Sequence, residues 1–148
     1  MMKNWQSVLF KLLKTFFILL LLSTAIGKLL DIPGFADVIG TYQFGLSGVI
    51  ATGLALAISL FELQLALFML RKPLSLLIGF LLTLMHSGYT LLAIITLSRG
   101  IEIENCGCFG VFLARPMTNI TVVEDLVLTA MSALYWYLSM RISKTSKA

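Results

Sequence analysis

Residues 46–70, LSGVIATGLALAISLFELQLALFML, form an unbroken apolar run with a single ionisable side chain, Glu62. At about 1.5 Å of rise per residue, a helix of this length crosses a hydrocarbon core about 30 Å thick. The run has no alternation of apolar and polar residues, so it favours a helix over a strand of a membrane barrel. We therefore interpret it as a transmembrane helix.

Three further runs of the same kind lie at residues 12–30, 74–97 and 120–140. Arg71-Lys72-Pro73 leaves only a short turn between the runs at 46–70 and 74–97. The chain is 59% hydrophobic and 12% charged, whereas soluble domains carry about 25% charged residues. A soluble fold of this composition would expose large apolar patches. The sequence predicts an all-α integral membrane four-helix bundle, with residues 1–148 forming a single domain.

Basic residues near the span ends predict the orientation, because cytoplasmic segments are enriched in Lys and Arg. Three positions, Lys28, Arg99 and Arg115, fall on one side. Eight fall on the other: Lys3, Lys11, Lys14, Arg71, Lys72, Arg141, Lys144 and Lys147. This bias predicts a multi-pass protein of the bacterial inner membrane with both termini in the cytoplasm. The basic residues form no single stripe, so they give no indication of nucleic-acid binding.

The first apolar run has a competing interpretation as a secretory signal peptide. Ser23-Thr24-Ala25 resembles a small-residue cleavage site after a basic start and an apolar segment. The apolar run continues to Leu30, which favours a retained helix.

The two cysteines of the chain lie in Asn105-Cys106-Gly107-Cys108-Phe109-Gly110, within the loop at residues 98–118. The predicted orientation places this loop in a compartment that favours disulfides. A Cys-x-Cys ring is small, and strained or exposed disulfides exchange readily. Cys106 and Cys108 are therefore our candidates for thiol–disulfide exchange. An inert structural disulfide remains an alternative, and so does a partial metal site, although a closed zinc site needs more ligands than this motif offers.

Glu62 is the only acidic residue of the second predicted span, and His86, the only histidine of the chain, lies near the middle of the third. Such groups usually face the bundle interior and mark function. Together they are our candidates for binding a quinone-like headgroup, and quinone is the cofactor class that they suggest. The alternative for each is a structural hydrogen bond between helices.

Four charged residues near the loop are candidates for supporting roles. Lys28 and Asp31 are spaced for an ion pair on one helical face, and that corner of the chain is expected to dock against the cysteine loop or to anchor the helix at the interface. Lys28 and Arg115 are candidates for stabilising a thiolate. Asp125 is expected to bond the loop or to pair with Arg115 or Arg99.

The chain resembles the MauE family, within the wider DoxX-like membrane proteins. Four segments carry the resemblance: Gly27-Lys28-Leu29-Leu30-Asp31 with Pro33-Gly34-Phe35, Phe61-Glu62-Leu63, the cysteine motif, and Glu124-Asp125-Leu126-Val127-Leu128. The family often has Arg where this chain has Glu124, so any family role for a basic residue before Asp125 is in doubt here.

The resemblance implies a four-helix membrane protein that assists maturation of a disulfide-rich periplasmic methylamine dehydrogenase beside a thioredoxin-like partner. We accordingly predict an accessory protein that supports thiol–disulfide chemistry or maturation of exported proteins, with the lipid bilayer and a periplasmic thioredoxin-like protein or exported client as partners. The alternatives are a non-enzymatic membrane scaffold and a quinone-binding or small-molecule-binding subunit of a respiratory complex.

Overall fold

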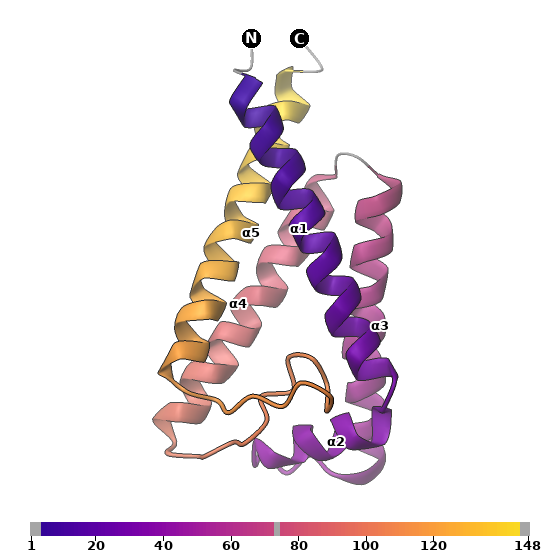
Figure 1. Ribbon diagram of the computed structural model, residues 1–148, viewed down its shortest axis with the longest axis vertical. Helices are drawn as coiled ribbons and strands as arrows, with labels where there is room; N and C mark the ends of the chain where they lie inside the picture. The colour runs from indigo at the N-terminus through magenta and orange to yellow at the C-terminus, as the bar shows by residue number, and fades with distance from the viewer. Residues whose placement is uncertain (1–3, 73–74, 146–148) are drawn as a thin grey trace.

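The computed structural model describes residues 4–72 and 75–145, and helices are the only regular elements in those ranges. They are α1 (Asn4–Leu29), α2 (Ile32–Thr41), α3 (Gly48–Arg71), α4 (Leu76–Ser98) and α5 (Asn119–Thr145). Four of these helices are long, and the short α2 crosses the end of the molecule that also carries the α4–α5 loop (Figure 1). The predicted all-α class is confirmed.

The long helices pack mainly in two pairs, α1 with α3 and α4 with α5. One core cluster joins the pairs through Phe10 and Phe17 of α1 and Tyr135 of α5. The rings of Phe10 and Tyr135 stack with their centroids 5.0 Å apart. From the end that carries the termini, α1 and α5 diverge toward the loop end (Figure 1). A second cluster fills the loop end, and it contains Phe35, Tyr42, Ala93 and Cys106.

Three helices are long and apolar enough to cross a membrane in the described part of the chain: Trp5–Leu29, Gly48–Arg71 and Leu76–Ser98. The sequence prediction had four such spans. The fourth, α5, has the necessary length, but it is less apolar because it carries Glu124, Asp125 and several hydroxyl side chains. Long apolar side chains remain exposed on the other helices, such as Leu77 and Leu91 on α4, as a lipid-facing surface requires.

The helix α2 was not predicted from the sequence. Pro33 lies in the first turn of α2, where its missing N–H is not needed. Asp31 caps this helix by accepting a hydrogen bond of 2.9 Å from the Gly34 N–H. The predicted Lys28–Asp31 ion pair is therefore wrong.

Some sequence predictions fall outside the described ranges. Lys3 and Lys147, which contribute to the charge bias, lie there, and so does Pro73 of the short turn. The loop between α4 and α5 spans residues 99–118, which agrees with the predicted loop to within one residue.

Candidate functional site

The cysteine loop is held directly against the end of α1. Gly107 and Gly110 have φ values of 72° and 71°, in the left-handed region that glycine tolerates best. The backbones of the loop and of α1 also approach closely, because a Cβ atom added to Gly27 would lie 2.5 Å from the Phe109 carbonyl oxygen. The predicted docking of this corner of the chain against the cysteine loop is confirmed.

Hydrogen bonds fix the backbone around the two cysteines. The Asn105 side chain accepts from the Gly107 N–H at 2.9 Å and donates to the Gly110 carbonyl at 3.1 Å. The Tyr42 hydroxyl at the end of α2 donates to the Cys106 carbonyl at 2.7 Å. The Cys106 N–H in turn donates to the Arg115 carbonyl at 2.8 Å. These four hydrogen bonds thus hold the backbone around both cysteines in one conformation.

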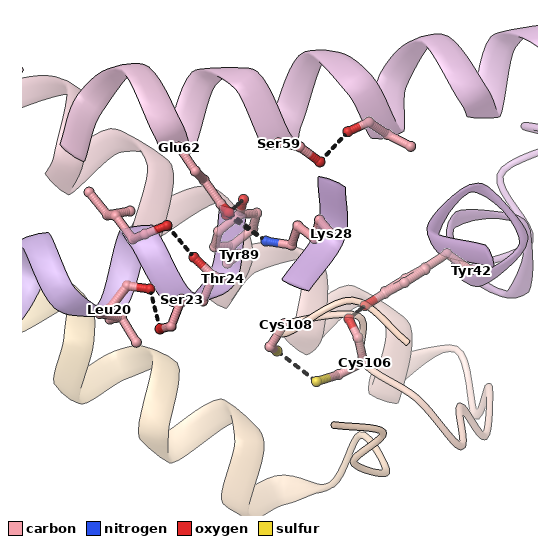
Figure 2. A network of polar contacts seen from close by, with 12 residues as sticks. Leu20, Ser23, Thr24, Lys28, Tyr42, Ser59, Glu62, Tyr89, Cys106 and Cys108 are labelled. Atoms are coloured by element: carbon pink, nitrogen blue, oxygen red, sulfur yellow. Dashed lines mark hydrogen bonds and ion pairs between the residues drawn. The ribbon is translucent and has the colours of Figure 1, made fainter. Parts of the chain in front are cut away.

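The cysteine side chains lie next to each other, with the two Sγ atoms 2.6 Å apart and no disulfide bond between them (Figure 2). Cys106 is buried, whereas Cys108 is partly exposed. A hydrogen bond from the Cys108 thiol lowers the pKa of Cys106 to about 7, and the same bond together with burial raises the pKa of Cys108. Cys106 is therefore the cysteine that forms a thiolate near neutral pH, whereas the Cys108 thiol stays protonated there.

A buried ion pair lies in the interior beside the loop. The Lys28 ammonium donates to both carboxylate oxygens of Glu62, at 2.6 and 2.8 Å. The Tyr89 hydroxyl of α4 donates to Glu62 Oε1 at 2.5 Å. These three side chains come from α1, α3 and α4 and point toward one another (Figure 2). Lys28, which the sequence placed beside Asp31, is thus the partner that balances the charge of Glu62 in the membrane interior.

His86 lies nearby but bonds its own helix. Its Nδ1 is 2.8 Å from the Leu82 carbonyl oxygen, and its ring meets Phe17 of α1 edge-on at 5.3 Å between centroids. The hydrogen bond between helices that the sequence suggested as its structural role is therefore replaced by a bond within α4.

The acidic and basic residues near the start of α5 pair differently from the prediction. Arg115 forms an ion pair of 2.6 Å with Glu124, not with Asp125. The side chains of Arg115 and Glu124 are 45% and 46% exposed. Arg99 donates to the backbone carbonyls of Tyr42 and Gln43, both at 3.1 Å. The expected pairing of Asp125 with Arg115 or Arg99 is wrong, because the neighbouring Glu124 faces Arg115.

One cavity of about 590 Å³ connects these features. Its polar lining includes the two cysteines, the ion-pair side chains, His86, Tyr89, Arg115 and Asp125. The rest of its wall is mainly apolar side chains from α1, α3 and α5, such as Leu20, Ile58 and Leu128. Asp31 is not part of the wall; it caps α2. The structure therefore brings together seven of the eight residues singled out from the sequence, around one space.

Sequence reasoning missed Tyr89, Tyr42 and Asn105. Tyr89 follows His86 by three residues on α4, so a helical wheel centred on His86 would have placed it on the same face. Asn105 was quoted only as part of the motif, although Asn side chains commonly bond the backbone two residues on. Nothing in the sequence pointed to a role for Tyr42, because its hydrogen bond to the loop depends on the position of α2, which was not predicted.

These features define a helical membrane protein with a thiol pair and a buried ion pair on one interior cavity. The family model described as methylamine utilisation protein MauE matches residues 6–138, so the chain belongs to the MauE family. The family description implies a role in methylamine utilisation. Comparisons with curated proteins and with solved structures gave no match.

Proposed function

We propose that this protein is a thiol–disulfide exchange partner in the bacterial inner membrane, which supports maturation of exported, disulfide-containing proteins. The observation that carries this proposal is the placement of the Cys106 and Cys108 sulfurs 2.6 Å apart on the cavity wall. Family membership supports a client connected with methylamine utilisation, such as methylamine dehydrogenase. A periplasmic thioredoxin-like protein is the proposed redox partner.

The proposed topology has α5 as a fourth span and both termini in the cytoplasm. The cysteine loop then faces the periplasm, where disulfides persist. The burial of Phe17 and Leu21 of α1 in the core supports a first helix that is retained in the mature protein. A membrane-impermeant maleimide applied to reduced cells should label the cysteines from the periplasmic side, and labelling only from the cytoplasmic side would contradict this topology.

The two cysteines have different roles in the proposed exchange. In the oxidised protein, a partner thiolate attacks the Cys108 sulfur, because Cys108 is the more exposed of the two. The Cys106 sulfur leaves as a thiolate, and the thiol with the lower pKa is the better leaving group. The product is a mixed disulfide between Cys108 and the partner. A second partner thiol then resolves it, leaving Cys106 and Cys108 reduced and the partner oxidised.

Trapping in cells tests this order of events. Cys106→Ser should accumulate a mixed disulfide, which forms when its Cys108 thiolate attacks the disulfide of an oxidised partner and displaces one partner thiolate. The adduct persists because no Cys106 thiolate is present to resolve it. The matched variant Cys108→Ser should accumulate much less. Both adducts are measured on non-reducing gels and by mass spectrometry of the attached protein. Client maturation that stays normal in Cys106→Ser/Cys108→Ser, at normal protein levels, would instead support a scaffold without exchange chemistry.

A further inference from the structure

The cavity extends from the cysteine pair to the membrane-facing surface. Among its lining residues, Phe16 of α1 and Val123 and Val127 of α5 are 41%, 57% and 52% exposed. A side chain that is exposed and also lines a cavity marks its opening. Phe16 lies within a candidate membrane span, and α1 and α5 diverge toward the loop end (Figure 1). One opening of the cavity therefore lies between α1 and α5, beside a candidate membrane span.

The inner end of the cavity offers both a donor and an acceptor. Two of the three N–H donors of Lys28 go to Glu62, which leaves one for an acceptor in the cavity. His86 Nδ1 faces the Leu82 carbonyl, which only accepts, so Nδ1 carries the proton and Nε2 of the neutral ring is an acceptor. A quinone carbonyl accepts hydrogen bonds, whereas the hydroxyl of its reduced form also donates them. The same two side chains thus suit both redox forms.

The charge at the inner end of the cavity argues against an ionic ligand there. Glu62 already neutralises Lys28, and both side chains are nearly fully buried, at 2% and 3% exposed. A second fixed charge there would need its own partner. The volume of about 590 Å³ lies within the range of roughly 300–1,000 Å³ typical of small-molecule sites. A neutral ring with an apolar tail matches the polar inner end, the apolar walls and the opening to lipid.

We propose that this cavity binds a lipid-soluble quinone, which enters between α1 and α5 and oxidises the Cys106–Cys108 dithiol directly. Two S–H bonds break and one S–S bond forms. The two electrons and two protons released convert the quinone to its hydroquinone, which leaves into the bilayer. This inference rests on the proposed exchange function, because the quinone regenerates the disulfide that the partner consumes. One cysteine pair then serves both substrates in alternation.

The test uses purified, reduced full-length protein in nanodiscs under anaerobic conditions, with decylubiquinone as the probe. We expect loss of two thiols per hydroquinone formed, followed by maleimide mass shift and by quinone absorbance. Val127→Trp, which fills the opening, should slow this oxidation by about tenfold or more. The control is Leu126→Trp, at the adjacent exposed position of α5 that does not line the cavity, and it should react at the normal rate.

Oxidation by the water-soluble oxidant diamide checks that each variant is folded with reactive thiols, and it should be unchanged in both. If Val127→Trp fails this check, Val123→Trp takes its place. The inference is overturned if decylubiquinone leaves the wild-type thiols reduced, even if it binds. It is also overturned if plugging the opening leaves the rate unchanged. Trapping of a partner by Cys106→Ser is independent of added quinone, so it shows separately whether the exchange function stands.

Discussion

Lys28 of α1 and Glu62 of α3 form an ion pair 2.6 Å long in the interior of the bundle, with side chains 3% and 2% exposed. The pair joins α1, which contacts the cysteine loop, to α3, the helix against which α1 mainly packs. Lys28 also lies over the rings of Phe35 and Tyr89, 5.5 and 5.6 Å from their centroids. Its positive charge is thus balanced by one carboxylate and two aromatic faces.

Breaking this pair on one side should strongly destabilise the protein. Glu62→Gln or Lys28→Met leaves the other charge buried without a counter-ion, which costs about 3–5 kcal/mol. The double variant Lys28→Met/Glu62→Leu should recover much of that loss, because no charge is left buried. Thermal unfolding in detergent measures all three. The exposed pair supplies the control, since Arg115→Ala should change stability by no more than about 1 kcal/mol. Equal losses in the double and single variants would contradict the assignment.

The alkylation rate of the reduced protein should depend on pH through Cys106. Its pKa is lowered from 9.0 to about 7, so its thiolate predominates above pH 7 and is lost as the pH falls below it. Iodoacetamide labelling, resolved by peptide mass spectrometry, should therefore rise through a midpoint near pH 7 at Cys106 and only at much higher pH at Cys108. In Cys108→Ala, which has no hydrogen-bond donor at this position, the Cys106 midpoint should move upward. A Cys106 midpoint near 9 in the wild type would refute the hydrogen-bonded pair.

Substitution of Gly107 should disrupt the loop. Its φ is 72°, and an added Cβ would lie 2.9 Å from atoms of both Phe35 and Val38. Gly107→Ala therefore combines a backbone penalty of about 1–2 kcal/mol with a clash against α2. Gly100→Ala is the matched control, because Gly100 has a φ of 69° but no atom within 4 Å of the added Cβ. Thermal unfolding should show the larger loss in Gly107→Ala, and equal losses would show that the contact with α2 is unimportant.

Removing the Tyr42 hydroxyl should loosen the cysteine loop without unfolding the bundle. Tyr42→Phe deletes the 2.7 Å bond to the Cys106 carbonyl and should cost about 0.5–1.5 kcal/mol. Hydrogen exchange of the loop backbone should become faster, while exchange within α1 and α3 stays the same. Exchange that is unchanged in the loop would mean that this bond does not restrain it.

The parts of the fold that follow from local sequence were predicted well. A long apolar run in the sequence marks a helix directly, so α3 and α4 were expected close to where they occur. The end of α1 was also expected correctly, but this helix begins eight residues before the predicted start at residue 12. The short α2 was hidden because a Pro-Gly pair is as typical of a turn as of a helix start.

Pairings between distant residues could not be derived in this way. Lys28 had a sequence neighbour of opposite charge, Asp31, but its partner Glu62 is on another helix. Adjacent residues on a helix point about 100° apart, so the choice between Glu124 and Asp125 depends on how α5 is rotated. The cavity depends on the relative placement of all five helices, which composition and spacing do not encode.

The helix ends next to the two termini lie together, at the opposite end of the bundle from the cysteine loop (Figure 1). α1 alone separates these ends by about 39 Å, from its 26 residues at about 1.5 Å each. A fluorescent reporter fused to either terminus should therefore leave access to the sulfurs unobstructed. An engineered reductase domain attached by a short tether at the same point would be too far away to reach them.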